Sequence, residues 1–142
     1  MANKEPSKTA FIVEGASDLA ALLSIGLFGF GRPQCSGCVQ IITATLSRLD
    51  IKRVVIIADA DDPGLNGANA LVQELDIPSV IYIPPAKDLR QSLALGLSST
   101  LIESTLKNQT WNQPKKKYQL NSWNHFTETK KPVKQNLVNI PT

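Results

Sequence analysis

The sequence lacks long hydrophobic runs and carries no sign of an export signal. No apolar stretch reaches the roughly 18–20 residues that a membrane-spanning helix needs, so we expect no membrane partner. The charged residues near the N-terminus, within residues 1–8, are not followed by an apolar segment, as a secretory signal would require. The sequence therefore predicts a cytoplasmic protein.

Residues that bind soft metals are also scarce. The chain has two cysteines, Cys35 and Cys38, and one histidine, His125, which lies far from them. A structural zinc site needs four ligands, so no zinc is expected. A redox pair would need a helix start within a thioredoxin-like βαβ unit. The neighbouring glycine, proline and serine favour a strand-to-helix loop over a redox or metal role, and the role of the two cysteines stays open.

A chain of 142 residues, 42% of them hydrophobic, has the size and composition of one globular domain. The net charge of +3 hides an asymmetry. Residues 107–142 carry seven lysines and one acid, Glu128, whereas residues 1–106 carry more acids than bases. A basic extension on an acidic domain indicates either attraction to a polyanion or a solubilising terminus.

Hydrophobic periodicity predicts strands that alternate with helices. Apolar runs predict strands over 9–13, 28–30, 53–58 and 79–83. Helical spacing predicts helices over 18–25, 38–49, from Pro63 to about Leu75, and over about 89–95 and 99–107. Ser17 is the expected N-cap of the first helix, and Asp62 is the expected N-cap of the third. This order predicts an α/β fold, a Rossmann-like, mostly parallel sheet of about four strands with helices on both faces.

Composition divides the chain into three parts. Residues 1–8 are polar and predict a disordered leader, and residues 9–107 form the predicted domain. From Asn108 onward Asn, Gln, Lys and Pro dominate, which predicts a basic, flexible tail over 108–142. The tail interleaves aromatic residues with lysines, a mixture that can stack on bases and follow a phosphate backbone.

Two acidic clusters directly follow predicted strands. Glu14 comes after the first strand, and Asp59 and Asp61 come after the third. Parallel strands end at the same edge of a sheet, the edge where open α/β sheets bind ligands, so these carboxylates should converge. A hard divalent cation with oxygen ligands would neutralise them. The sequence therefore predicts a Mg²⁺ or Mn²⁺ site and chemistry on phosphates.

The motif Glu14-Gly15-x-x-Asp18 after one strand, with Asp59-x-Asp61 and Gly64 after another, resembles the TOPRIM domain. That domain is shared by bacterial primases, type IA and type II topoisomerases, OLD-type nucleases, a ribosomal RNA maturation nuclease and a recombination mediator. The resemblance covers about residues 9–95 and implies a compact α/β sandwich. The segment from Pro85 to Asp88 is similar to primase and primase–helicase versions, so the nearest type is the primase core.

The resemblance implies roles for individual residues. Glu14 would act on the metal or as general acid or base, and Asp59 and Asp61 would be catalytic metal ligands. Asp18 and Asp88 would be accessory metal ligands. The residues expected to contact phosphate or nucleic acid are Gly15, Arg32, Gly64, Lys87, Lys115, Lys116 and Lys117. Purely structural roles stay open for some of these residues. Asp18, Asp61 and Asp62 could act only as helix caps or as partners of a helix dipole, and Lys87 and Asp88 could form a surface ion pair.

Three functions fit this pattern. The first is a Mg²⁺-dependent nucleotidyl-transfer core of the primase type, which takes part in DNA replication. A primase normally has a zinc module and another subdomain before this domain, so we expect partners such as a helicase or a zinc-ribbon protein. The second is a small stand-alone nuclease on DNA or RNA, and the third is a non-catalytic nucleic-acid-binding module. The intact Glu14 and Asp-x-Asp motif favour the first two.

Overall fold

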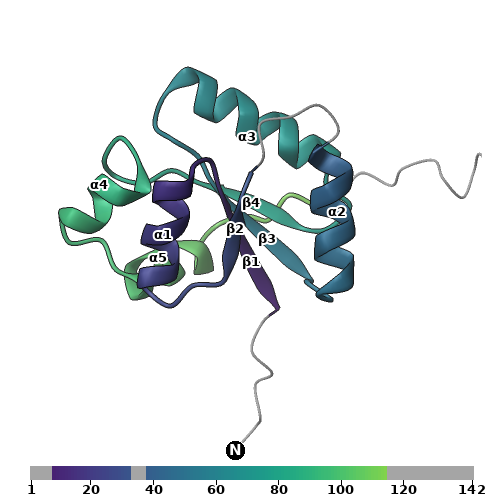
Figure 1. Ribbon diagram of the computed structural model, residues 1–142, viewed down its shortest axis with the longest axis horizontal. Coiled ribbons are helices and arrows are strands. Elements are labelled where there is room, and N and C mark those ends of the chain that lie inside the picture. The colour runs from purple at the N-terminus through teal and green to yellow at the C-terminus, as the bar shows by residue number, and fades with distance from the viewer. Residues whose placement is uncertain (1–7, 33–37, 115–142) are drawn as a thin grey trace, which may run out of the picture.

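The structure is a computed structural model, and it describes residues 8–32 and 38–114. Strands and helices alternate along the chain, and a fifth helix closes the series (Figure 1). The elements are β1 (Thr9–Val13), α1 (Ala16–Ser24), β2 (Gly29–Gly31), α2 (Cys38–Arg48), β3 (Arg53–Ile57), α3 (Asp62–Glu74), β4 (Ser79–Tyr82), α4 (Leu89–Ala94) and α5 (Ser99–Lys107).

The four strands form one parallel sheet in the order β2-β1-β3-β4. Phe11 of β1 is in register with Gly29 of β2 on one side and with Val55 of β3 on the other. The chain first moves outward from β1 to β2, then crosses β1 to reach β3. The predicted α/β fold, a mostly parallel sheet of about four strands with helices on both faces, is confirmed, and within the described residues the sheet is entirely parallel.

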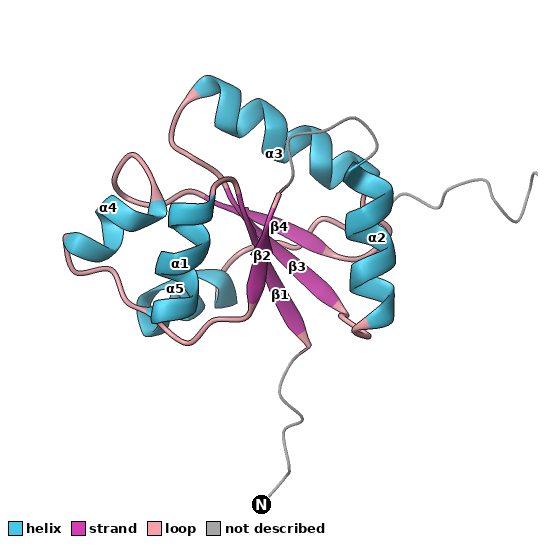
Figure 2. Ribbon diagram, in the orientation of Figure 1, coloured by secondary structure: helices cyan, strands magenta, loops and turns pink. Residues whose placement is uncertain are grey.

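Helices cover both faces of the sheet (Figure 2). One core contains residues of α2 and α3 packed on alternate residues of β1 and β3, such as Ile12 and Ile56. The other core contains residues of α1, α4 and α5 packed on the intervening residues, such as Phe11 and Val55. Because β1 and β3 are buried on both faces, these two strands read as continuous apolar runs rather than alternating ones.

The placement of the helices follows from the strand order. The β1-to-β2 connection runs in one direction along the sheet with α1 on one face, and the β3-to-β4 connection runs in the opposite direction with α3 on the other face. Connections of the same hand require this arrangement. All strands consequently end at one edge, and the connections after β1 and β3 leave toward opposite faces.

Three predicted boundaries are corrected. The second strand is Gly29–Gly31 rather than 28–30. Helix α1 starts at Ala16 with extended Gly15 as its N-cap, because the carbonyl of Gly15 already accepts from the N–H of Leu19 at 3.0 Å, so Ser17 lies inside the helix. Asp61 rather than Asp62 caps α3, because its side chain reaches the N–H of Gly64.

The described part of the basic segment packs on the domain. Asn112 forms an antiparallel bridge with Ser79 at the outer edge of β4, through two backbone hydrogen bonds of 2.8 and 3.0 Å. Trp111 packs against the core of α1, α4 and α5, and the Arg53 guanidinium lies 4.9 Å from the centre of its ring. Residues 115–142, with Lys115, Lys116 and Lys117, lie outside the described residues.

Within residues 8–32 and 38–114, no helix has both the length and the apolar character needed to cross a membrane.

Candidate functional site

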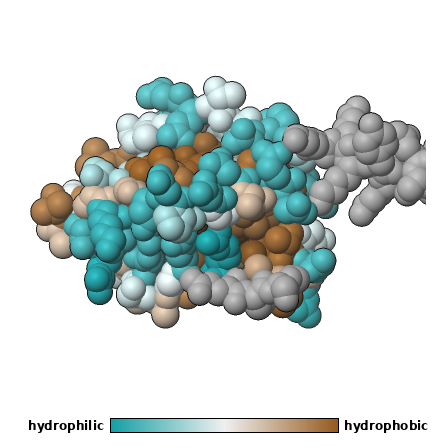
Figure 3. All heavy atoms as spheres, turned by 90° about the horizontal axis from the view of Figure 1, so that it is seen from above, coloured by the Kyte–Doolittle hydropathy of each residue, from teal (hydrophilic) through white to brown (hydrophobic). Residues whose placement is uncertain are grey.

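The candidate site lies where β1 and β3 end. These neighbouring strands are also where the strand order reverses, since β2 lies on one side of β1 and β4 lies beyond β3. Open α/β sheets bind ligands at such switch points. Glu14 follows β1 directly, and Asp59 follows β3 after one residue. Seen from above, hydrophilic residues run across the middle of the molecule between apolar patches (Figure 3).

Glu14 and Asp59 have side chains within hydrogen-bonding reach of each other. Burial raises the pKa of Glu14 most, and the negative charge of Asp59 and a side-chain hydrogen bond with it raise that pKa further. A hydrogen bond between two carboxyl groups needs a proton on one of them, which is why this contact favours the protonated form of Glu14 and raises its pKa. The charge of Asp61 adds a smaller increase, so Asp61 also lies close enough to Glu14 to interact with it electrostatically.

Asp61 is both a helix cap and a neighbour of the acidic pair. One of its carboxylate oxygens, Oδ1, accepts from the backbone N–H of Gly64 at 2.7 Å. A Cβ atom at Gly64 would lie 2.7 Å from the Asp59 carbonyl oxygen and 2.9 Å from Asp61 Oδ1. Glycine is therefore needed at 64 for close approach of the backbone. The same test at Gly15 finds open space around the added Cβ.

Asp18 is buried and points toward helix α4 rather than standing free. Only 8% of the surface of this residue is exposed to solvent. Burial raises its pKa most and the charge of Asp59 raises it further, whereas a hydrogen bond from the backbone N–H of Arg90 lowers it. Asp88 is also close enough to raise the pKa of Asp18 by its charge. The structure thus gathers Asp18, Asp59 and Asp88, and it gives Asp18 a capping contact on another helix.

Asp88 caps the same helix, since its Oδ1 accepts from the N–H of Gln91 at 2.7 Å. The buried Ser92 fixes the preceding loop, because its hydroxyl accepts from the N–H of Ala86 and donates to the carbonyl of Asp88. The backbone N–H of Ala60 donates to the carbonyl of Lys87 at 2.9 Å. These bonds hold the Pro85–Asp88 segment beside the Asp59–Asp61 loop, while the Lys87 side chain is exposed.

Arg32 brings a positive charge to the acidic pair. It follows β2 directly, and its Nη2 donates to Glu14 Oε1 at 3.3 Å. The side chains are 20% and 24% exposed, respectively. The positive charge lowers the pKa of Glu14, but burial and Asp59 outweigh it and the net direction is upward. Arg32 therefore offsets only part of the effects that favour the protonated form of Glu14.

The donor atoms at this edge fit a hard divalent cation. Glu14 and Asp59 offer carboxylate oxygens that lie close to each other, and Asp61 has one oxygen outside its capping bond. Mg²⁺ and Mn²⁺ prefer such oxygens and would relieve the repulsion between them. In this structure, no three acids, histidines or cysteines among the described residues form a preassembled metal-binding group.

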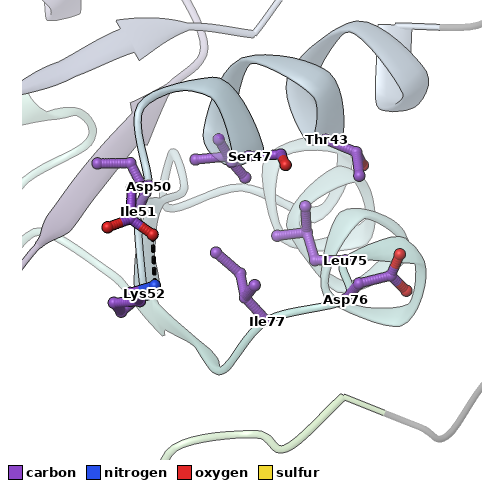
Figure 4. A pocket seen from close by; sticks show the side chains of 9 residues that line it. Thr43, Ser47, Asp50, Ile51, Lys52, Leu75, Asp76 and Ile77 are labelled. Atoms are coloured by element: carbon purple, nitrogen blue, oxygen red, sulfur yellow. Dashed lines mark hydrogen bonds and ion pairs between the residues drawn. The ribbon is translucent and has the colours of Figure 1, made fainter.

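A pocket lies at the edge of the sheet opposite the candidate site (Figure 4). It has a volume of about 350 Å³ and lies between the ends of α2 and α3 and the start of β3. Its lining mixes apolar residues with hydroxyl and charged groups, among them Leu46, Leu75 and Asp76. At its rim Asp50 pairs with Lys8 and Lys52. None of the predicted site residues lines this pocket.

Comparisons with known proteins add no relative. The chain matches no protein-family model, and no curated protein matches it.

Some contacts had no signal in the sequence. The hydrogen bond between Asp18 and the backbone of Arg90 joins residues far apart in the chain, and no sequence pattern predicts this contact. Gly67, whose neighbour in space is the Arg32 guanidinium, reads in the sequence as an ordinary helical glycine. Cys38 begins α2 and is a free thiol, whereas Cys35 lies outside the described residues.

Proposed function

We propose that this chain is a Mg²⁺- or Mn²⁺-dependent phosphoryl-transfer domain acting on nucleic acid, of the TOPRIM type and nearest to the catalytic core of a primase. The observation that carries the proposal is the pairing of Glu14 and Asp59 at the switch point between β1 and β3. Two partly buried carboxylates whose interaction Arg32 offsets only in part are costly at a ligand-binding edge if their role is purely structural.

Each residue has a chemical task in this proposal. Asp59 and Asp61 would hold the metal together with Glu14. A bound divalent cation supplies charge neutralisation for a phosphate and for the attacking oxygen. Glu14, whose pKa is raised, is suited to take a proton from an attacking hydroxyl. Asp18 and Asp88 would be accessory metal ligands only, because each already accepts a backbone hydrogen bond.

The substrate in this proposal is a DNA or RNA strand, and the cytoplasm is its expected location. Lys87 lies next to the acidic loops and would offset phosphate charge. A helicase or a zinc-ribbon protein would supply the remaining functions of primer synthesis. Strand cleavage by the same residues is the alternative reaction, since both reactions attack a phosphorus atom with an oxygen nucleophile.

The test is metal binding measured by isothermal titration calorimetry. We expect the wild type to bind Mg²⁺ and Mn²⁺ and the Asp59→Asn/Asp61→Asn double variant to lose binding. Asparagine at 61 keeps the cap acceptor, so α3 should stay intact. The matched control is Asp62→Asn, which removes an exposed charge from the first turn of the same helix. Equal binding by the wild type and the double variant would refute the proposed site.

Reaction class is then decided with two assays on the wild type. Extension of a primer or synthesis of short oligonucleotides from nucleoside triphosphates indicates nucleotidyl transfer. Metal-dependent shortening of a labelled strand indicates a nuclease. Metal binding without either reaction, in the presence of a helicase or zinc-ribbon partner as well, would assign the chain to the non-catalytic nucleic-acid-binding class.

A further inference from the structure

The backbone of Arg32 is fixed at the candidate site. Its N–H donates to the carbonyl of Val13, the last residue of β1, at 2.7 Å. The side chain then reaches across the end of β1 to Glu14 Oε1. A residue anchored in this way can move its guanidinium group while its Cα stays in place, and the reach of the guanidinium is limited to the edge where Glu14 and Asp59 lie.

The guanidinium group of Arg32 packs against helix α3. A Cβ atom on Gly67 would lie 2.7 Å from both Nη1 and Nη2 of Arg32, so the guanidinium rests directly against the glycine backbone. The next residue, Ala68, lines a void with Glu14 and Arg32 that is too narrow for a water molecule. Two small residues on α3 thus leave space for the planar group and hold it near Glu14.

We propose that Arg32 exchanges Glu14 for a phosphate group and thereby couples metal binding to phosphate binding at this site. This inference rests on the proposed function. In the free protein Arg32 occupies one oxygen of Glu14 and places a positive charge where a cation would bind. A phosphodiester of a nucleic-acid strand offers the guanidinium two anionic oxygens for bidentate contact, which is stronger than the single contact with Glu14.

The coupling has a defined sign. A metal that takes Glu14 releases Arg32 for phosphate, and a phosphate that takes Arg32 releases Glu14 for the metal. Each ligand therefore raises the affinity for the other by the same factor, as linkage requires. A purely structural ion pair gives a different result, because its removal would lower stability without improving metal binding.

The test uses three variants of the full chain. Arg32→Gln removes the charge, Arg32→Lys keeps the charge but loses the planar fork, and Arg48→Gln removes an exposed arginine from the last turn of α2 as the matched control. Calorimetry gives the affinity for Mg²⁺ and Mn²⁺ of the protein alone. Fluorescence anisotropy with a labelled oligothymidylate of about 12 nucleotides, with and without Mg²⁺ at constant ionic strength, gives the coupling.

We expect Arg32→Gln to bind metal about five-fold or more tightly than the wild type, and we expect Mg²⁺ to tighten oligonucleotide binding in the wild type but not in Arg32→Gln. Arg32→Lys should bind metal like the wild type but the oligonucleotide more weakly, and Arg48→Gln should keep the wild-type coupling. Metal binding that is equal or weaker in Arg32→Gln overturns this inference and leaves the metal site intact. Absence of metal binding in every protein, with and without oligonucleotide, overturns both the inference and the proposed function.

Circular dichroism and thermal melting verify that each variant is folded. If Arg32→Gln fails to fold, Arg32→Lys still decides the inference, because unchanged oligonucleotide affinity and unchanged coupling in that variant would overturn it.

Discussion

The carboxylate of Asp18 in α1 accepts a hydrogen bond from the backbone N–H of Arg90 in α4. Asp88, the N-cap of α4, accepts from the next N–H, that of Gln91. Two acids from distant parts of the chain therefore satisfy neighbouring donors of one short helix. The bond ties the helix that follows Glu14 to the loop that follows β4, so it helps to hold the two sides of the candidate site together.

Replacing Asp18 should therefore destabilise the protein. We expect Asp18→Ala to lower the free energy of unfolding by about 1–2 kcal/mol, because a helix N–H loses its acceptor in a buried place. Asp18→Asn keeps an acceptor oxygen and should lose clearly less. Urea denaturation followed by circular dichroism measures both. An alanine variant as stable as the wild type would contradict the assigned hydrogen bond.

Stability should rise as the solution is made weakly acidic. The pKa values of Glu14 and Asp18 are raised, so the folded protein binds protons on these groups more tightly than the unfolded chain does. Stability then increases as pH falls from neutral through the raised values, and the gain is complete near the ordinary values of 4.5 and 3.8. Thermal melting in the presence of a chelator over this range measures the effect.

Asp50 acts in the opposite direction at lower pH. Lys52 and Lys8 lower its pKa to about 2, so its favourable contribution is lost as pH falls from 3.8 toward 2. The group is exposed and its effect is small.

The Asp59→Asn variant is the control for the acidic pair of Glu14 and Asp59. It should be more stable than the wild type at neutral pH without metal and should show a flatter pH profile, and an unchanged profile would contradict the assigned repulsion.

Two glycines of α3 should respond differently to the same change. Gly64→Ala places a Cβ against the backbone oxygen of Asp59 and should cost about 1–3 kcal/mol of stability. Gly67→Ala meets only the flexible end of Arg32, and the gain in helix propensity of about 0.5–1 kcal/mol offsets that displacement. Urea denaturation of the pair measures the difference. Equal losses in both variants would contradict the close approach at Gly64.

The C-terminal segment should separate into a structural and an electrostatic part. A chain that ends at 107 loses the contacts of Trp111 and Asn112 with the sheet, and we expect it to be less stable by about 1–3 kcal/mol. A chain that ends at 114 keeps these contacts but loses six lysines. It should bind a labelled oligonucleotide more weakly and with a smaller salt dependence. An unchanged salt slope would show that these lysines do not contact phosphate.

Sequence patterns predicted the architecture because the two central strands, β1 and β3, are buried on both faces. The runs at 9–13 and 53–58 contain nothing but apolar residues after their first position, and strands of this kind belong to parallel sheets. The position of Glu14, Asp59 and Asp61 at one edge followed from parallel strands alone. The weak points were helix starts: Gly15 rather than Ser17 is the N-cap of α1, and Asp61 rather than Asp62 caps α3.

The remaining features of the site depend on packing that no local pattern encodes. The capping of α4 by Asp18 depends on how α1 and α4 lie against each other on one face of the sheet. The contact of Arg32 with Gly67 depends on the distance between the end of β2 and α3. The sequence predicted that Arg32 faces phosphate, but the pairing with Glu14 required the three-dimensional arrangement.

The strand order also dictates when the acidic pair is assembled during folding. Strand β1 can pair with β2 as soon as the β1-α1-β2 crossover unit closes, whereas its pairing with β3 joins Thr9 to Arg53 across a much longer loop. Contacts across longer loops form at a higher entropic cost and later. Glu14 and Asp59 therefore meet only when the two halves of the sheet dock, and their repulsion acts on that last step rather than on the formation of either half.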